Sequence, residues 1–155
     1  MAVKKTLKIF LIGLIILWVI SLIVARLLLP VANPDKRNAL PDWLSDNSKA
    51  SIKRSCFDCH SNEVVYPWYS YMPVVSMLVA VDVKKGRKNL NFSLWDENDF
   101  QGIRRDFDDV LEVINEDTMP LSIYTILHPD TIFSRSEYIS LINDYEGYLK
   151  LNQTK

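Results

Sequence analysis

The chain has 155 residues, of which 48% are hydrophobic and 24% charged, so its composition excludes a disordered, collagen-like or disulfide-rich protein. The 126 residues that follow the apolar block at 9–29 suffice for one domain and exclude two large ones. Four basic residues and no acidic one precede residue 30, which leaves 14 basic and 19 acidic residues in the remainder. Because an acidic domain attracts polyphosphate poorly, we expect no nucleic-acid partner.

The first element is the apolar stretch at residues 9–29, which contains only three polar residues, Gly13, Ser21 and Arg26. As a helix that rises ~1.5 Å per residue, it covers the thickness of a bilayer's hydrocarbon core. We therefore predict a transmembrane anchor in contact with membrane lipid. Residues 1–8 are basic, so the positive-inside rule places them in the cytoplasm and the rest of the chain on the periplasmic side of the cytoplasmic membrane. A cleaved signal peptide and a buried core helix remain as alternatives.

Residues 30–47 are rich in proline, asparagine, aspartate and serine, which predicts a tether. Beyond it, apolar residues recur every three or four positions, and this spacing predicts four helices, at 48–59, 74–88, 96–116 and 135–150. No segment alternates as a strand would. We therefore predict an all-α domain over residues 48–155, with long ordered loops, behind a single transmembrane helix.

Local signals refine these helices. Ser48 can cap the first of them, and the pattern Ser134-x-x-Glu137 is a capping box that opens the last. In the helix at 74–88, Met77 lies on the apolar face, where a methionine is typically a core-filling residue.

The two cysteines of the chain form the sequence Cys56-Phe-Asp-Cys59-His60, and Cys-x-x-Cys-His is the c-type haem attachment pattern. On a helix, residues three apart share a face, so both sulfurs can form thioethers to one haem while His60 ligates its iron. A thioredoxin-like redox pair, a zinc site and a structural disulfide remain as alternatives. Aromatic residues near the motif are candidates for packing on the haem: Phe57, Tyr66, Trp68, Tyr69, Tyr71, Phe92 and Trp95.

The sixth iron ligand is the next question, and Met119 is the preferred candidate. It directly precedes Pro120, which disfavours helical geometry and stiffens the loop that presents the sulfur. His128, Met72 and Met77 are the alternatives, together with an iron that has no sixth protein ligand.

Four segments carry a resemblance to a known family: Cys56-Phe-Asp-Cys-His-Ser-Asn-Glu63, Tyr66-Pro-Trp-Tyr-Ser-Tyr71, Leu90-Asn-Phe-Ser-Leu-Trp95, and Met119-Pro-Leu-Ser-Ile-Tyr124 with His128-Pro129. Over about residues 35–150 the chain resembles the bacterial haem-binding domain family of membrane-anchored c-type cytochromes. The resemblance implies an exported, cytochrome c-like helical domain with one covalent haem c. It matches Cys56, Cys59 and His60 to the attachment motif and Met119 to the Met-Pro position, so iron would be held by His60 and Met119.

These features favour an electron carrier over an enzyme, since one haem with two axial protein ligands leaves no open iron for catalysis. We expect a redox partner protein, whose identity the sequence does not name. A haem-based sensor or accessory subunit with an open or displaceable sixth ligand is the main alternative. A peroxidase is a further one, and it would need His128 or a carboxylate as distal acid or base.

Overall fold

The structure is a computed structural model that describes residues 2–28, 33, 40–72 and 74–152. Every regular element in this part of the chain is helical, which confirms the predicted all-α fold. The α-helices are α1 (Ala2–Leu28), α2 (Asp46–His60), α3 (Val75–Asn89), α4 (Phe100–Asn115), α5 (Ser122–Leu127) and α6 (Arg135–Asn152). Short 3-10 helices lie between them: η1 (Trp68–Tyr71), η2 (Phe92–Leu94) and η3 (Pro129–Thr131).

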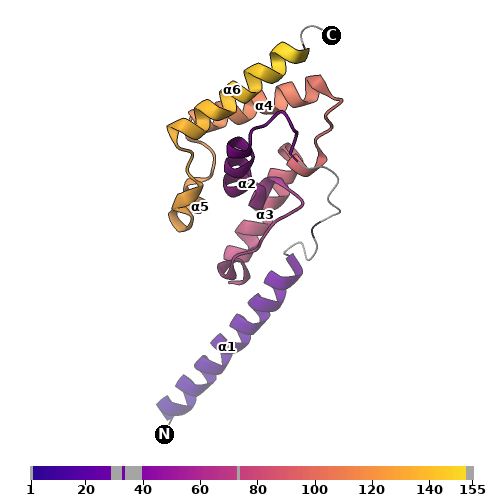
Figure 1. Ribbon diagram of the computed structural model, residues 1–155. Helices are drawn as coiled ribbons and strands as arrows, with labels where there is room; N and C mark the ends of the chain where they lie inside the picture. Colours follow the sequence, from indigo (N-terminus) through magenta and orange to yellow (C-terminus); the bar gives the residue numbers. More distant parts are fainter. Residues whose placement is uncertain (1, 29–32, 34–39, 73, 153–155) are drawn as a thin grey trace.

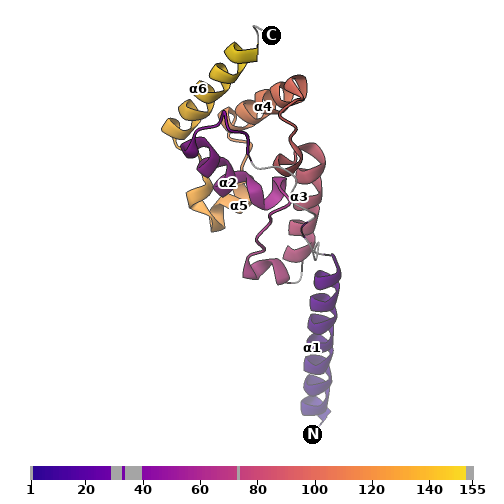
Figure 2. The ribbon, with the colours of Figure 1, turned by 45° about the vertical axis from the view of Figure 1, so that its right-hand side comes forward.

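Helix α1 projects away from the other helices, and only its carboxyl end lies beside them (Figures 1 and 2). Its side chains from Lys4 to Ile20 are exposed, in keeping with a helix that is solvated by lipid. Within the described residues, one stretch, Lys4–Val24, is long and apolar enough to cross a membrane. The predicted end of the span at residue 29 and the tether residues 30–32 and 34–39 lie outside the described residues.

The hydrophobic core lies between α2, α4 and α6. Ile52, Phe107 and Leu141, one from each helix, are fully buried. Leu40 and Leu44 belong to the same core, although the sequence analysis placed them in the tether. These leucines flank a turn that is rich in helix-breaking residues, and such a composition does not indicate that the turn is buried.

Polar caps set where the helices begin. Ser45, rather than Ser48, caps α2 by accepting a hydrogen bond from the Ser48 backbone N–H at 3.3 Å, while Ser48 itself is buried. Asp99 caps α4, which is why this helix begins at Phe100 and not at the predicted residue 96. At α6 the predicted capping box is confirmed.

The Ser134–Glu137 box also joins α6 to α2. The Glu137 carboxylate accepts hydrogen bonds from the Ser134 backbone N–H at 2.8 Å, the Ser51 hydroxyl at 3.0 Å and the Arg54 guanidinium at 2.8 Å. Mainly because of Arg54, the pKa of Glu137 falls to about 2. Charged and partly buried, this contact fixes the two helices in register.

We expect Glu137→Gln to remove a pH-dependent part of the stability. A depressed folded-state pKa contributes stability that is complete above the unfolded value of 4.5 and is lost as the pH falls through about 2. As the pH falls from 4.5 to about 2, the unmodified chain should therefore lose stability until its free energy of unfolding approaches that of the variant. Urea unfolding at about pH 2.5, 4 and 6 measures the difference. Glu146→Gln is the control, because its exposed pair with Lys150 spans 3.8 Å and exposed pairs contribute little. A pH-independent difference for Glu137→Gln would contradict the assignment.

Helix α3 packs against α2, and its buried residues, Ser76, Ala80, Val83 and Gly86, are none larger than valine. The large apolar residues Met77, Leu78 and Val81 of α3, and Val74 at its N-cap, are exposed instead. The prediction that Met77 fills the core is therefore wrong. The two helix backbones lie so close together that the contact admits only small side chains.

Gly86 marks the closest approach, and we expect Gly86→Ala to destabilise the domain. A Cβ at this position would lie 2.5 Å from the Cys59 carbonyl oxygen, which is backbone and cannot move without shifting α2. Overpacking of this kind costs about 1–3 kcal/mol, which thermal unfolding measures. Gly147→Ala is the matched control on α6, because a Cβ there meets nothing within 4 Å. We expect it to be neutral or stabilising by up to ~1 kcal/mol. Equal effects of the two substitutions would contradict the close approach.

Asn33 is fixed to the domain by its side chain. The amide donates to the Val64 carbonyl at 3.0 Å and accepts from the Val64 N–H at 3.2 Å, as a paired strand would. It also accepts a 2.7 Å bond from the Arg87 guanidinium. The chain is therefore attached to the domain soon after α1 ends.

Candidate functional site

Helix α2 carries the Cys-x-x-Cys-His motif in its last two turns and ends at His60. Ser61 stops the helix, since its hydroxyl donates to the Phe57 carbonyl at 2.8 Å and accepts from the Glu63 N–H at 2.9 Å. The motif is therefore presented at a rigid helix end.

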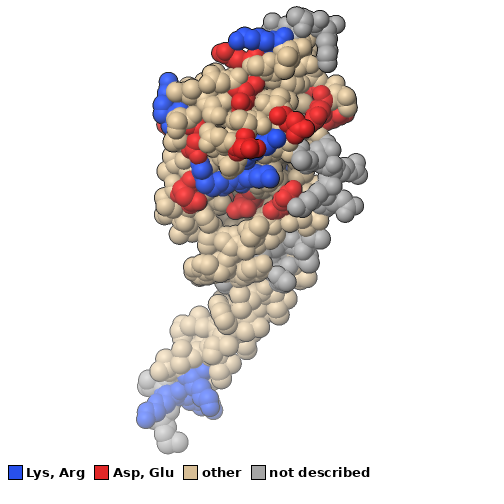
Figure 3. Space-filling model, in the orientation of Figure 1, with Lys and Arg blue, Asp and Glu red and all other residues tan. Residues whose placement is uncertain are grey.

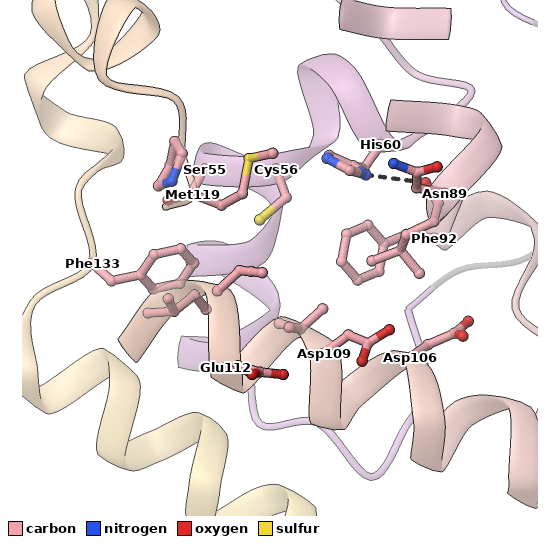
Figure 4. Close-up of a pocket in the computed structure, with 15 residues that line it drawn as sticks. Ser55, Cys56, His60, Asn89, Phe92, Asp106, Asp109, Glu112, Met119 and Phe133 are labelled. Carbon is pink, nitrogen blue, oxygen red and sulfur yellow. Dashed lines mark hydrogen bonds between the residues drawn. The ribbon is translucent and has the colours of Figure 1, made fainter. Parts of the chain in front are cut away.

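A cavity of about 380 Å³ lies between this helix end, α4 and the loop after α4 (Figure 4). Such a volume is within the range of small-molecule sites. Most of its lining is apolar, and it includes Leu90, Phe92, Val110, Val113, Ile114 and Phe133. The lining residues that carry polar groups or sulfur are Ser55, Cys56, His60, Asn89 and Met119, with three acidic residues of α4, Asp106, Asp109 and Glu112. The cavity is thus a largely apolar space with an imidazole and two sulfur atoms on its wall.

The His60 ring is oriented by the backbone. Its Nδ1 lies 3.1 Å from the Leu90 carbonyl oxygen, which can only accept, so Nδ1 carries the proton and Nε2 keeps its lone pair. In Figure 4 this second nitrogen points toward the Met119 and Cys56 side chains. Burial lowers the pKa of His60, which favours the neutral imidazole. This is the tautomer and the outer hydrogen bond that a metal-ligating histidine needs.

Burial raises the pKa of both thiols, to about 12 at Cys56 and about 11 at Cys59. The thiol of Cys59 also faces Asp58 and Asp82, whose charges raise its pKa further. A thioredoxin-like pair needs the opposite shift, toward a stable thiolate. Both cysteines are free in the structure, and among its described residues no group of three or more histidine, cysteine or acidic side chains is arranged to hold a metal ion.

Met119 approaches the cavity from the loop that follows α4. The Thr118 and Met119 backbone N–H groups donate to the Val113 carbonyl at 3.0 and 3.2 Å, which folds the chain back over the end of the helix. Met119 is 36% exposed and lines the same cavity as Cys56 and His60. Methionine sulfur is a soft ligand that suits haem iron.

The alternative sixth ligands lie elsewhere. Nε2 of His128 is 2.6 Å from the Tyr69 hydroxyl, and the ring stacks on Tyr124 with centroids 4.4 Å apart. Met72 and Met77 are exposed, on η1's end and on α3. None of the three is among the residues that line the cavity.

The structure thus brings together Cys56, His60 and Met119 of the predicted site, whereas Cys59 is not among the cavity-lining residues. Of the aromatic candidates, Phe92 lines the cavity, while Trp68 and Tyr71 are exposed. Sequence reasoning missed Phe133, which precedes α6 and carries no motif.

Sequence reasoning also missed a hydrogen bond to a residue of the motif. The Tyr124 hydroxyl donates to Asp58, the residue before Cys59, at 2.8 Å. This bond joins α5 to α2 and so holds the segment that follows Met119 against the attachment motif. Only the presence of an acid inside the motif hinted at such a contact.

The donor set and the lining fit a haem. A haem needs apolar surface for its faces and nitrogen or sulfur ligands for its iron, and the wall of this cavity offers both. Fold and site therefore define an all-helical protein with a haem-type cavity.

Comparison with protein families agrees with this class. A family model described as a haem-binding domain matches residues 20–146, from within α1 to within α6, so the chain belongs to the haem-binding domain family. This confirms the resemblance seen in the sequence. Neither the search of curated proteins nor that of solved structures gave a match.

Proposed function

We propose that the chain is a membrane-anchored c-type cytochrome that carries electrons outside the cytoplasm. One observation carries this proposal: His60 and Met119, which lie 59 residues apart in the sequence, line one apolar cavity together with Cys56. An imidazole and a thioether are the axial pair typical of cytochromes c. Two protein ligands leave the iron no free position, which suits electron transfer.

Each residue has a separate task in this proposal. A bound haem supplies a one-electron iron couple. Cys56 and Cys59 would hold it by thioether bonds, and the Leu90 carbonyl keeps the lone pair of His60 Nε2 directed at the cavity. The Met119 thioether favours reduced iron, whereas the α4 carboxylates favour oxidised iron. The apolar lining surrounds both ligands on the cavity wall.

Membrane anchoring is supported by the apolar stretch Lys4–Val24 and by the basic residues before it. We expect the domain to lie on the outer face of the cytoplasmic membrane. Protease added to intact spheroplasts should therefore digest residues 40–152 without lysis. A domain that is cut only after lysis would contradict this orientation.

The exposure of Met119 favours a second candidate function. A ligand that is 36% exposed is one that a diffusible ligand can displace, as in a haem-based sensor. The two functions differ in how the ferrous protein reacts with carbon monoxide, because only an iron with an open or weakly held sixth position binds it readily.

The test uses the purified full-length holoprotein. An electron carrier should follow a reversible one-electron redox titration and should show slow or absent carbon monoxide binding. Ready binding of carbon monoxide would place the sensor first, and turnover of peroxide would indicate a peroxidase.

A further inference from the structure

An apolar surface lies at the end of the domain that faces α1. It consists of large apolar residues in η1, in α3 and between the two, each of which is 37–77% exposed: Trp68, Tyr71, Met72, Val74, Met77, Leu78 and Val81. We call this set the basal surface. Soluble monomers rarely expose so many large apolar side chains in one place, and such patches mark interaction sites.

The pattern of α3 shows that this exposure is systematic. Val74, Met77, Leu78 and Val81 follow the i, i+3, i+4, i+7 spacing of a single helix face. The opposite face, of small residues, is the one buried against α2. A helix of a water-soluble protein usually turns such a face toward the core, whereas here it is exposed.

The basal surface is continuous with the proposed membrane span. Helix α1 contacts both α3 and η1. Tyr71 lies beside Leu22, Ile23 and Leu27, at the carboxyl end of α1. Figures 1 and 2 agree that the start of α3 and the adjoining η1 lie at the level where α1 meets the domain. A bilayer that surrounds Lys4–Val24 therefore ends at the height of the basal surface.

Charge is missing from the same region. The sequence has no lysine, arginine, aspartate or glutamate between Glu63 and Asp82. On the face shown in Figure 3, the end of the domain next to α1 carries no charged atoms, and the acidic and basic side chains lie farther from α1. Tryptophan and tyrosine, both present here, are enriched where membrane proteins meet the headgroup layer.

We propose that the basal surface is immersed in the interfacial layer of the outer leaflet, so that the domain lies on the membrane in one orientation. This inference rests on the proposed membrane anchoring by α1. A lipid surface is the occupant because it is already present at this height around α1, whereas a protein partner would first have to displace it. Immersion of an apolar helix face in this layer is favourable in proportion to the area buried.

The experiment is photo-crosslinking of the full-length protein in vesicles of phosphatidylcholine and phosphatidylglycerol. A benzophenone-bearing amino acid replaces one exposed leucine at a time: Leu17 in α1, Leu78 in the basal surface, or Leu151 in the last turn of α6. Helix α6 ends at the side of the domain opposite α1 (Figure 1). Circular dichroism of each variant confirms that the fold is retained.

We expect phospholipid adducts, detected by mass spectrometry, at positions 17 and 78 and not at position 151. Adducts at position 17 alone would overturn the basal surface as a lipid contact while the anchor stands. If no lipid adduct formed at any of the three positions, the anchor and the inference would be overturned together. Cross-linked dimers at position 78, or equal lipid labelling at 78 and 151, would also overturn the inference.

Discussion

Replacement of Cys56 and Cys59 together by alanine is expected to leave no haem on the chain after denaturation. Two thioether bonds survive detergent and heat, whereas ligation by His60 and apolar packing are lost when the domain unfolds. Haem staining of a denaturing gel measures the effect directly, and mass spectrometry of the intact chain gives the number of haems. We expect one haem in the unmodified chain and none in the double variant.

Two controls sharpen this experiment. Each single cysteine variant keeps one thioether and should retain some stain, and Met119→Ala should stain fully, because methionine ligates without a covalent bond to the haem itself. A double variant that still carries haem through denaturation would show that the attachment motif is misassigned.

Met119→Ala is expected to open the iron. The weak far-red charge-transfer band of sulfur-ligated ferric haem should disappear, and the ferrous form should bind carbon monoxide readily. Loss of a soft ligand that favours reduced iron should also lower the reduction potential, by on the order of 0.1 V. Absorption spectroscopy and a redox titration measure these changes.

His128→Ala is the matched control for this prediction. His128 is held by Tyr69 and Tyr124 and does not line the cavity, so its loss should leave the far-red band and the carbon monoxide reaction unchanged. If His128→Ala, and not Met119→Ala, opened the iron, the ligand assignment would be wrong and the loop after α4 would have a structural task only.

The long helices and the site's central residues could be predicted because their signals are local. Helical spacing of apolar residues, the capping box at Ser134 and the Cys-x-x-Cys-His motif each depend on residues close together in the sequence. Helix α5 was missed because it has six residues, too few for periodicity to show. Met119 and His128 both directly precede a proline, so the preference for Met119 depended on its position after a helix and on its soft sulfur, and it stays a prediction. The structure adds that Met119, and not His128, lines the cavity.

What could not be predicted depends on packing between distant elements. The apolar stripe of α3 was correctly placed on one face, but periodicity alone does not tell whether that face is buried or exposed. Likewise, nothing local shows that the Leu90 carbonyl orients His60, or that Asp58 bonds Tyr124, since these partners are 30 and 66 residues apart.

The attachment of Asn33 to Val64 and Arg87 limits how far the domain can move from helix α1. Four residues, 29–32, lie between Leu28 at the end of α1 and Asn33, and the five Cα–Cα steps that join the two span at most about 18 Å when fully extended. A free tether of residues 30–47 would have allowed the domain to move several times that distance from the end of α1. In the proposed membrane-anchored carrier, this short connection would keep the domain in a thin layer above the bilayer, so a membrane-bound redox partner would encounter it far more often than one that diffuses through the periplasm.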